Sequence, residues 1–205
     1  MEFLFVGCSI TWGDELKDRF STRYSKLVCK ALGATENNTA ECGRSNDWIA
    51  RRTVEETRKK KYDRVYVQLT VPSRIEYFTE DAYSGLRFKL KMKGVEQVAA
   101  KMYYSNFYNA RLGIENLYKN KFIIESAVTD TELIFISFDS SREHEKQYRH
   151  IHDNAHWNSF CKIESIQIFE DILEERYKVV KNRLGPRGHP LESEHQKIAD
   201  YLLSI

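Results

Sequence analysis

The chain has 205 residues, of which 41% are hydrophobic and 30% are charged, so it is long enough for one domain with a full core. Its 32 basic and 30 acidic residues are interspersed and give a formal net charge of +2, which offers no electrostatic argument for a nucleic-acid or membrane partner. No segment approaches the roughly 20 apolar residues of a membrane span or has the layout of a signal peptide, so we expect a cytoplasmic protein.

The four cysteines lie far apart in the chain and form no C-x-x-C pair. They are Cys8, Cys29, Cys42 and Cys161. Such scattered cysteines indicate neither a zinc site nor a disulfide framework, and they are typical of reduced, mostly buried thiols. We expect no cofactor.

The first elements are predicted to be a strand, a turn and a helix. Residues 2–8 form a short apolar run that is typical of a strand buried on both faces. Residues 23–34 carry apolar side chains at three- and four-residue steps, which predicts a helix, and Gly33 is its expected stop.

A second strand and a second helix are expected next. The strand lies within 35–42, and residues 47–60 predict a helix capped by Ser45 or Asn46. The basic run at 51–61 alternates with glutamates at helical spacing, which favours a solvated helix face over a nucleic-acid patch.

A third strand is expected at 63–70, stopped by Pro72, and a fourth at 131–138. Strands that alternate with helices predict a mostly parallel sheet covered on both faces, which is a three-layer α/β/α fold.

Two polar segments are additional to the alternating strands and helices of such a fold. Residues 75–120 hold a tyrosine-rich insertion followed by a helix through 95–120, and residues 139–162 are polar and histidine-rich. Long excursions of this kind are commonly lids or substrate loops. Because no repeat or linker divides the chain, we expect a single domain over 1–205.

Polar turns follow the predicted strands. "GCSITWG" follows the first, "CGRSND" the second and "TVPSR" the third, while His189 and Pro190 come just before a C-terminal helix. Because the carboxyl ends of parallel strands form one edge where ligands bind, these turns should meet at one exposed rim.

The blocks resemble those of the SGNH hydrolases, the GDSL-like esterase/lipase family, in the same order over most of the chain. "GCSITWG" keeps the glycine, serine, threonine and second glycine of the first family block, and "PRGHPLESEHQKIA" is similar to the last. The resemblance implies a flavodoxin-like fold, Ser9 as nucleophile, Gly43 as an oxyanion donor and His189 as general base. His195 is expected to pack rather than to react.

Two departures concern the nucleophile and the oxyanion hole. Cys8 stands where an aspartate is usual, and strand alternation directs it away from the side chain of Ser9. Thr70, in "QLTV", stands where the family has an asparagine donor. The resemblance therefore implies an oxyanion hole of Ser9, Gly43 and Thr70, with a hydroxyl in place of an amide.

A third departure concerns the base. Pro186 replaces the aspartate that the family pattern has three residues before the histidine. Such an aspartate orients the imidazole and stabilises its cation. Here Ser9 and His189 would form a dyad, steadied by a main-chain carbonyl or by a carboxylate such as Glu192.

The candidate substrate contacts are less specific. They are Asn46, Arg74, His152 and His156. Asn46 also suits a helix cap, and Arg74 would meet either an anionic substrate or an acid such as Glu76. The two histidines belong to an H-x-H-x-x-x-H pattern for which metal ligation, substrate contact and a plain surface loop all remain open, with no metal expected.

The resemblance implies a serine esterase or deacylase that acts through an acyl-enzyme. The polar, aromatic lid favours a small acyl group, such as acetyl, on a polar carrier such as a carbohydrate. Two alternatives stay open: an acyltransferase that uses the same Ser-His site, and a catalytically weak or inactive binding or regulatory protein. We expect neither a membrane nor a nucleic acid as partner.

Overall fold

The structure is a computed structural model. It describes residues 1–78, 83–86, 95–137, 164–165, 185–186 and 188–205. The predicted segment 139–162 lies outside these residues.

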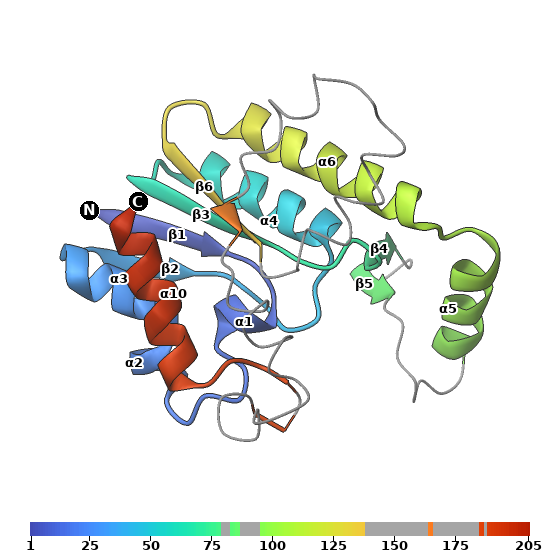
Figure 1. Ribbon diagram of the computed structural model, residues 1–205. Helices are drawn as coiled ribbons and strands as arrows, with labels where there is room; N and C mark the ends of the chain where they lie inside the picture. The colour runs from blue at the N-terminus through green and yellow to red at the C-terminus, as the bar shows by residue number, and fades with distance from the viewer. Residues whose placement is uncertain (79–82, 87–94, 138–163, 166–184, 187) are drawn as a thin grey trace.

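A parallel sheet forms the centre of the molecule (Figure 1). Its strands are β1 (Glu2–Val6), β2 (Thr35–Asn38), β3 (Arg64–Leu69), β6 (Glu132–Ser137) and β7 (Glu164–Ser165). They lie in the order β2-β1-β3-β6-β7, and every pairing is parallel. This is the strand order of flavodoxin-like folds. The four strands expected from the sequence are confirmed, and the short β7 adds a fifth.

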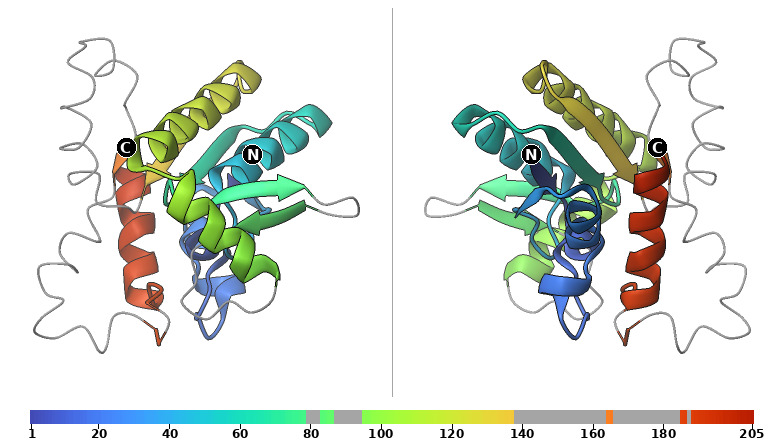
Figure 2. Two further views of the ribbon diagram at one scale, coloured as in Figure 1. Left: turned by 90° about the vertical axis from the view of Figure 1, so that its right-hand side faces the viewer. Right: turned by 90° about the vertical axis from the view of Figure 1, so that its left-hand side faces the viewer.

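Helices cover both faces of the sheet, which confirms the three-layer α/β/α prediction. The helices α3 (Tyr24–Leu32) and α10 (Glu192–Ser204) pack on one face, and α4 (Asn46–Lys59) and α6 (Ala110–Ala127) on the other. Figure 2 shows α10 on one side of the molecule and α4 with α6 on the opposite side.

The alternation of side chains along β1 divides the core in two. Phe3 and Phe5 face α3 and α10, and the ring of Phe5 stacks on Tyr66 with a centroid distance of 4.5 Å. Leu4 and Val6 face α4 and α6. Because both faces of the strand are buried, its sequence is a continuous apolar run.

Local signals in the sequence define the helix ends. Gly33 ends α3 with a left-handed backbone (φ 63°), as expected. Ser45 caps α4 by accepting a hydrogen bond from the N–H of Trp48 at 3.3 Å, so the cap is Ser45 rather than Asn46.

The insertion at 75–120 differs from the prediction of one helix through 95–120. It begins with an antiparallel hairpin of β4 (Ile75–Phe78) and β5 (Tyr83–Leu86). Two helices follow, α5 (Val95–Asn106) and α6, because the side chain of Asn109 caps a new helix start. In Figure 1, α5 lies outside the three layers, at the end towards which the parallel strands point.

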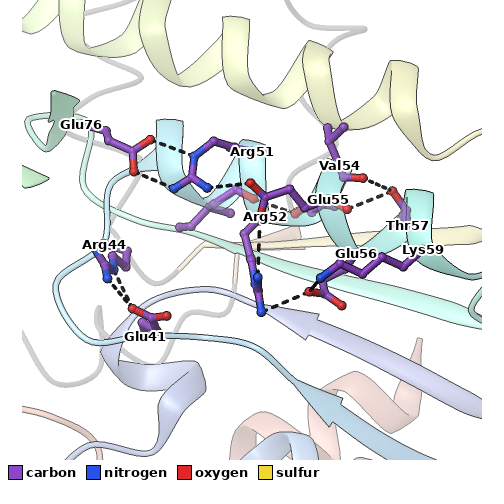
Figure 3. Close-up of polar contacts among 12 residues, drawn as sticks. Glu41, Arg44, Arg51, Arg52, Val54, Glu55, Glu56, Thr57, Lys59 and Glu76 are labelled. Atoms are coloured by element: carbon purple, nitrogen blue, oxygen red, sulfur yellow. Dashed lines mark hydrogen bonds and ion pairs between the residues drawn. The ribbon is translucent and has the colours of Figure 1, made fainter. Parts of the chain in front are cut away.

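The basic run on α4 is balanced by acidic side chains of the same molecule (Figure 3). Arg51 bonds Glu55 at 2.7 Å and Glu76 of the hairpin at 2.9 Å, and Arg52 bonds Glu56 at 3.1 Å. The face that we expected to be only solvated therefore also anchors the hairpin to α4.

No helix within the described residues is long and apolar enough to cross a membrane.

Candidate active site

Ser9 lies directly beyond the carboxyl end of β1, as the first residue of the short helix α1 (Ser9–Trp12). Its position at the end of the sheet follows the prediction, but its exposure does not: we expected an exposed rim, and Ser9 is only 7% exposed. The chain turns tightly after α1, where the N–H groups of Gly13 and Asp14 both donate to the carbonyl oxygen of Ser9, at 3.1 and 2.9 Å.

A buried amide on β3 fixes the turn that carries Ser9. Gln68 Oε1 accepts hydrogen bonds from the N–H of Cys8 at 3.0 Å and from Thr11 Oγ1 at 2.8 Å. Thr11 Oγ1 also lies 2.8 Å from the hydroxyl of Tyr24. Gly7 makes room, since a Cβ there would lie 2.4 Å from Thr11 Oγ1. The network is buried and hydrogen-bonded, so it holds the turn of Ser9 rigidly.

Our sequence analysis did not single out Gln68. The available signal was a polar amide inside an otherwise apolar strand, which needs hydrogen-bond partners when buried.

His189 meets a carboxylate from the serine segment. Its Nδ1 lies 2.7 Å from Glu15 Oε2, and its backbone N–H donates to the same oxygen at 3.1 Å. The two side chains are 20% and 6% exposed, so the pair is well shielded from water. A carboxylate at Nδ1 holds the ring proton there, which leaves Nε2 as the basic nitrogen. Nε2 faces Asp14, whose Oδ2 is 3.8 Å away.

Backbone features place Glu15 against His189. Glu15 has φ 69°, and it is the one residue other than glycine with positive φ in the described part of the chain. Strained backbone of this kind clusters at functional sites. Gly185 leaves space for the carboxylate, because a Cβ there would lie 2.6 Å from Glu15 Cδ, and the N–H of Gly185 donates to the carbonyl oxygen of His189 at 2.9 Å.

The group that orients His189 is therefore Glu15, which the sequence analysis missed. It is neither a main-chain carbonyl nor Glu192, whose Oε1 instead accepts from the N–H of Lys17 at 3.2 Å. Glu15 is far from His189 in the chain. The acidic pair of Asp14 and Glu15, directly after the serine turn, was the signal available.

The segment that follows Ser9 supplies the carboxylate that contacts His189. Among the described residues, no hydrogen bond joins Ser9 Oγ to the imidazole of His189, and the hydrogen-bond neighbour of Ser9 Oγ is Cys8 Sγ at 3.7 Å. Bonds between nucleophile and base are often loose in unliganded enzymes and tighten when substrate binds.

Thr70, the candidate side-chain donor to an oxyanion, is fixed through its backbone by Asn46. The amide of Asn46 accepts from Thr70 N at 2.9 Å and donates to Thr70 O at 2.9 Å. Asn46 is 1% exposed, so its side chain positions Thr70, and its contact with substrate stays a prediction. Gly43 lies in the turn after β2 with φ 77°, a conformation that favours glycine.

The side chain of Arg74, at the end of the turn that follows β3, contacts the side chain of Thr70. Its Nη1 donates to Thr70 Oγ1 at 2.8 Å, and it reaches the carbonyl oxygen of Arg44 at 3.5 Å. The predicted alternative of an ion pair with Glu76 is wrong, because that carboxylate pairs with Arg51.

The charge of Arg74 reaches the buried thiol of Cys8. The prediction that Cys8 points away from the side chain of Ser9 is wrong: the two side chains lie 3.7 Å apart, because β1 ends at Val6 and strand alternation does not extend to these residues. Burial disfavours the thiolate, but the positive charge of Arg74 is the main influence that favours it, and the pKa of Cys8 is lowered. This corner of the site is therefore electropositive.

His152 and His156 lie outside the described residues. Within the part of the chain that is described, no group of three or more histidine, cysteine or acidic side chains is arranged to hold a metal ion.

Comparison with known proteins identifies the fold. No protein-family profile matches the sequence, and no curated protein matches it either. Solved structures do match over nearly the whole chain. One is a member of the lipolytic G-D-S-L family from Veillonella parvula, with 13% identity, a TM-score of 0.54 and coverage of 100% of this chain and 97% of that one.

Two esterases of acetylated polysaccharides are also similar. A catalytic mutant of an acetylxylan esterase from Geobacillus stearothermophilus has 15% identity and a TM-score of 0.56, with 99% of this chain and 92% of that one covered. A two-domain esterase active on acetylated mannans has 14% identity and a TM-score of 0.59 over 100% of this chain, which spans 48% of that protein. The chain thus has the SGNH hydrolase fold, as its sequence resemblance predicts, in a divergent form.

Proposed function

We propose that this protein is a serine esterase or deacylase that removes a small acyl group, such as acetyl, from a polar carrier such as a carbohydrate. The observation that carries the proposal is the shielded pair of His189 and Glu15 beside the turn of Ser9. A base oriented by a carboxylate is the arrangement that activates a serine hydroxyl.

In the first step, His189 Nε2 takes the proton of Ser9 Oγ while that oxygen attacks the ester carbonyl carbon. Glu15 keeps the Nδ1 proton in place and stabilises the imidazolium that forms. The N–H groups of Ser9 and Gly43 and the hydroxyl of Thr70 donate to the oxyanion of the tetrahedral intermediate.

In the second half of the reaction, the imidazolium gives its proton to the leaving alcohol, and the acyl group stays on Ser9. His189 then takes a proton from a water molecule as its oxygen attacks the acyl carbon. The imidazolium returns that proton to Ser9 Oγ when the acyl–oxygen bond breaks, which releases the acid and restores the enzyme. Arg74, His152 and His156 remain the candidate contacts to the carrier, whereas the buried Asn46 would act by positioning Thr70.

The choice of a small acyl group on a carbohydrate rests on two supports. The first is the polar, tyrosine-rich insertion after β3, whose helix α5 lies beyond the ends of the parallel strands (Figure 1). The second is the substrate class of two structural neighbours, which are an acetylxylan esterase and an esterase active on acetylated mannans.

The test is steady-state hydrolysis of 4-nitrophenyl acetate and octanoate and of acetylated xylo-oligosaccharides. We expect acetyl esters to be turned over with the higher kcat/KM, and Ser9→Ala to lose activity on the order of 10⁴-fold or more. Full activity in folded Ser9→Ala would contradict the proposal. Binding of an oligosaccharide without any hydrolysis would favour a binding protein, and product formation that requires an alcohol acceptor would favour an acyltransferase.

A further inference from the structure

The turn after β3 brings a cation to the oxyanion side of the site. The N–H of Arg74 donates to the carbonyl oxygen of Val71 at 3.3 Å, which closes a turn with Pro72 at its second position, where proline is favoured. The turn returns the guanidinium over the residue where β3 ends, so that Nη1 donates to Thr70 Oγ1 at 2.8 Å.

This guanidinium has no carboxylate partner among the described residues. The nearby acids are committed elsewhere, since Glu76 pairs with Arg51 at 2.9 Å and Glu41 bonds Arg44 Nε at 2.9 Å. A partly buried cation without a counter-ion is costly unless negative charge arises beside it. The lowered pKa of the Cys8 thiol, to which Arg74 contributes, indicates that the same potential extends to the residue next to Ser9.

The hydrogen bonds of Thr70 determine what its hydroxyl offers to a ligand. Its Oγ1 accepts from Arg74 Nη1 at 2.8 Å and from the thiol of Cys8 at 3.4 Å. A hydroxyl has two lone pairs and one proton, so with both lone pairs engaged the group is left as a donor. A donor whose oxygen already accepts from a cation is polarised and donates more strongly.

We propose that Arg74 is a positioning residue of the oxyanion hole, which holds the Thr70 hydroxyl as a polarised donor where other SGNH hydrolases use an amide. The role rests on the proposed function, because it concerns the oxyanion of the same acyl transfer. Arg74 acts through Thr70, because its guanidinium bonds the Thr70 hydroxyl and not the oxyanion itself. Asn46 fixes the Thr70 backbone.

The experiment is a double-mutant cycle on kcat and KM for 4-nitrophenyl acetate, which carries no charge. Arg74→Met should lower kcat on the order of 10- to 100-fold with KM nearly unchanged, and Thr70→Val on the order of 100-fold or more. In the Thr70→Val background, Arg74→Met should have no further effect. Arg74→Lys should recover part of the activity, because the ammonium also donates and is charged.

Arg111→Met is the matched control, because it removes an equal charge from an arginine whose ion-pair partner in the described part of the chain is Glu115 on α6. It should leave kcat unchanged. Melting temperatures of all variants separate loss of fold from loss of rate. Independent, multiplicative effects of the Arg74 and Thr70 changes would overturn the proposal, as would a rise in KM alone, which would indicate ground-state binding.

Different results would contradict the proposed function and the proposed role of Arg74. Wild-type protein that hydrolyses no ester would contradict the proposed function and this role with it. Wild-type turnover with an unchanged kcat in Arg74→Met would contradict the role of Arg74 alone.

Discussion

The two halves of the candidate site are built in different ways. The base half joins His189 to Glu15, two residues far apart in the chain whose contact depends on a left-handed backbone and on a glycine without a Cβ. The oxyanion half is local to the end of β3, where Thr70 is pinned by the buried amide of Asn46 and covered by Arg74.

The halves differ from the family pattern in different respects: one in the segment that supplies a group, the other in the group itself. In the base half, the proposed orienting carboxylate is Glu15 from the serine segment, whereas the last block has Pro186 where the family pattern has an aspartate. In the oxyanion half, the proposed donor stands where the family pattern has an asparagine, but it is a hydroxyl with a cation beside it. Geometry and role thus define the site better than position in the sequence.

Among the changes that distinguish the two halves, the largest effect should come from Glu15→Gln. An amide at this place no longer stabilises the imidazolium and lets the ring take the wrong tautomer, so kcat should fall on the order of 10²- to 10⁴-fold with the fold retained. The measurement is kcat for 4-nitrophenyl acetate, and Glu192→Gln is the control, expected to stay within about threefold. Equal losses in both variants would contradict the assignment of Glu15.

The second effect is on stability and distinguishes the two histidines of the last block. His195 is fully buried and its Nδ1 accepts from the N–H of Tyr24 at 3.1 Å; burial lowers the pKa of His195 to about 4. The unfolded chain takes up this proton near pH 6.5, so stability is lost as the pH falls from about 6.5 to about 4.

The loss attributable to His195 should be about 3 kcal/mol at most over that window. Urea unfolding at pH 7 and pH 5 should show about 2 kcal/mol of this loss, because pH 5 covers only part of the window. His195→Gln keeps an acceptor for Tyr24 without titrating, so its stability should depend less on pH than that of the wild type. An identical pH dependence in both proteins would contradict a neutral, buried His195.

A smaller effect is expected at the glycine beside Glu15. In Gly185→Ala the new Cβ would meet the carboxylate of Glu15, so His189 should be displaced and kcat should fall about tenfold. Gly188→Ala is the matched control: it strains the same turn, with φ 83°, but its Cβ would meet nothing within 4 Å. A greater loss of kcat in the control would show that turn strain, rather than the carboxylate, matters.

The smallest effect should be that of Thr70→Asn, which restores an amide to the oxyanion half. Hydrolysis should stay within about threefold of the wild type or rise, because an amide donates without help from a cation. In this background Arg74→Met should cost little. A large loss of kcat in Thr70→Asn would show that the threonine hydroxyl or methyl has another task.

Much of the framework could be predicted from local patterns. The buried run of β1, the stop at Gly33 and the cap before α4 each depend on a few neighbouring residues, and each is confirmed. The break between α5 and α6 was missed because the apolar pattern continues through it, although Asn109 provides a cap.

The site was harder to predict because its contacts are long-range. Ser9 and His189 were found from their blocks, and their roles remain proposals. The contact of Glu15 with His189 depends on the path of the chain through Gly13 to Glu15 and on Gly185, and no spacing in the sequence encodes such a meeting.

The most direct test of the central claim is covalent labelling of folded protein by a fluorophosphonate, with the adduct located by mass spectrometry. The account predicts an adduct on Ser9 in the wild type, none in Ser9→Ala, and slower labelling in Glu15→Gln. No adduct on the folded wild type, or an adduct that persists at another residue in Ser9→Ala, would contradict it.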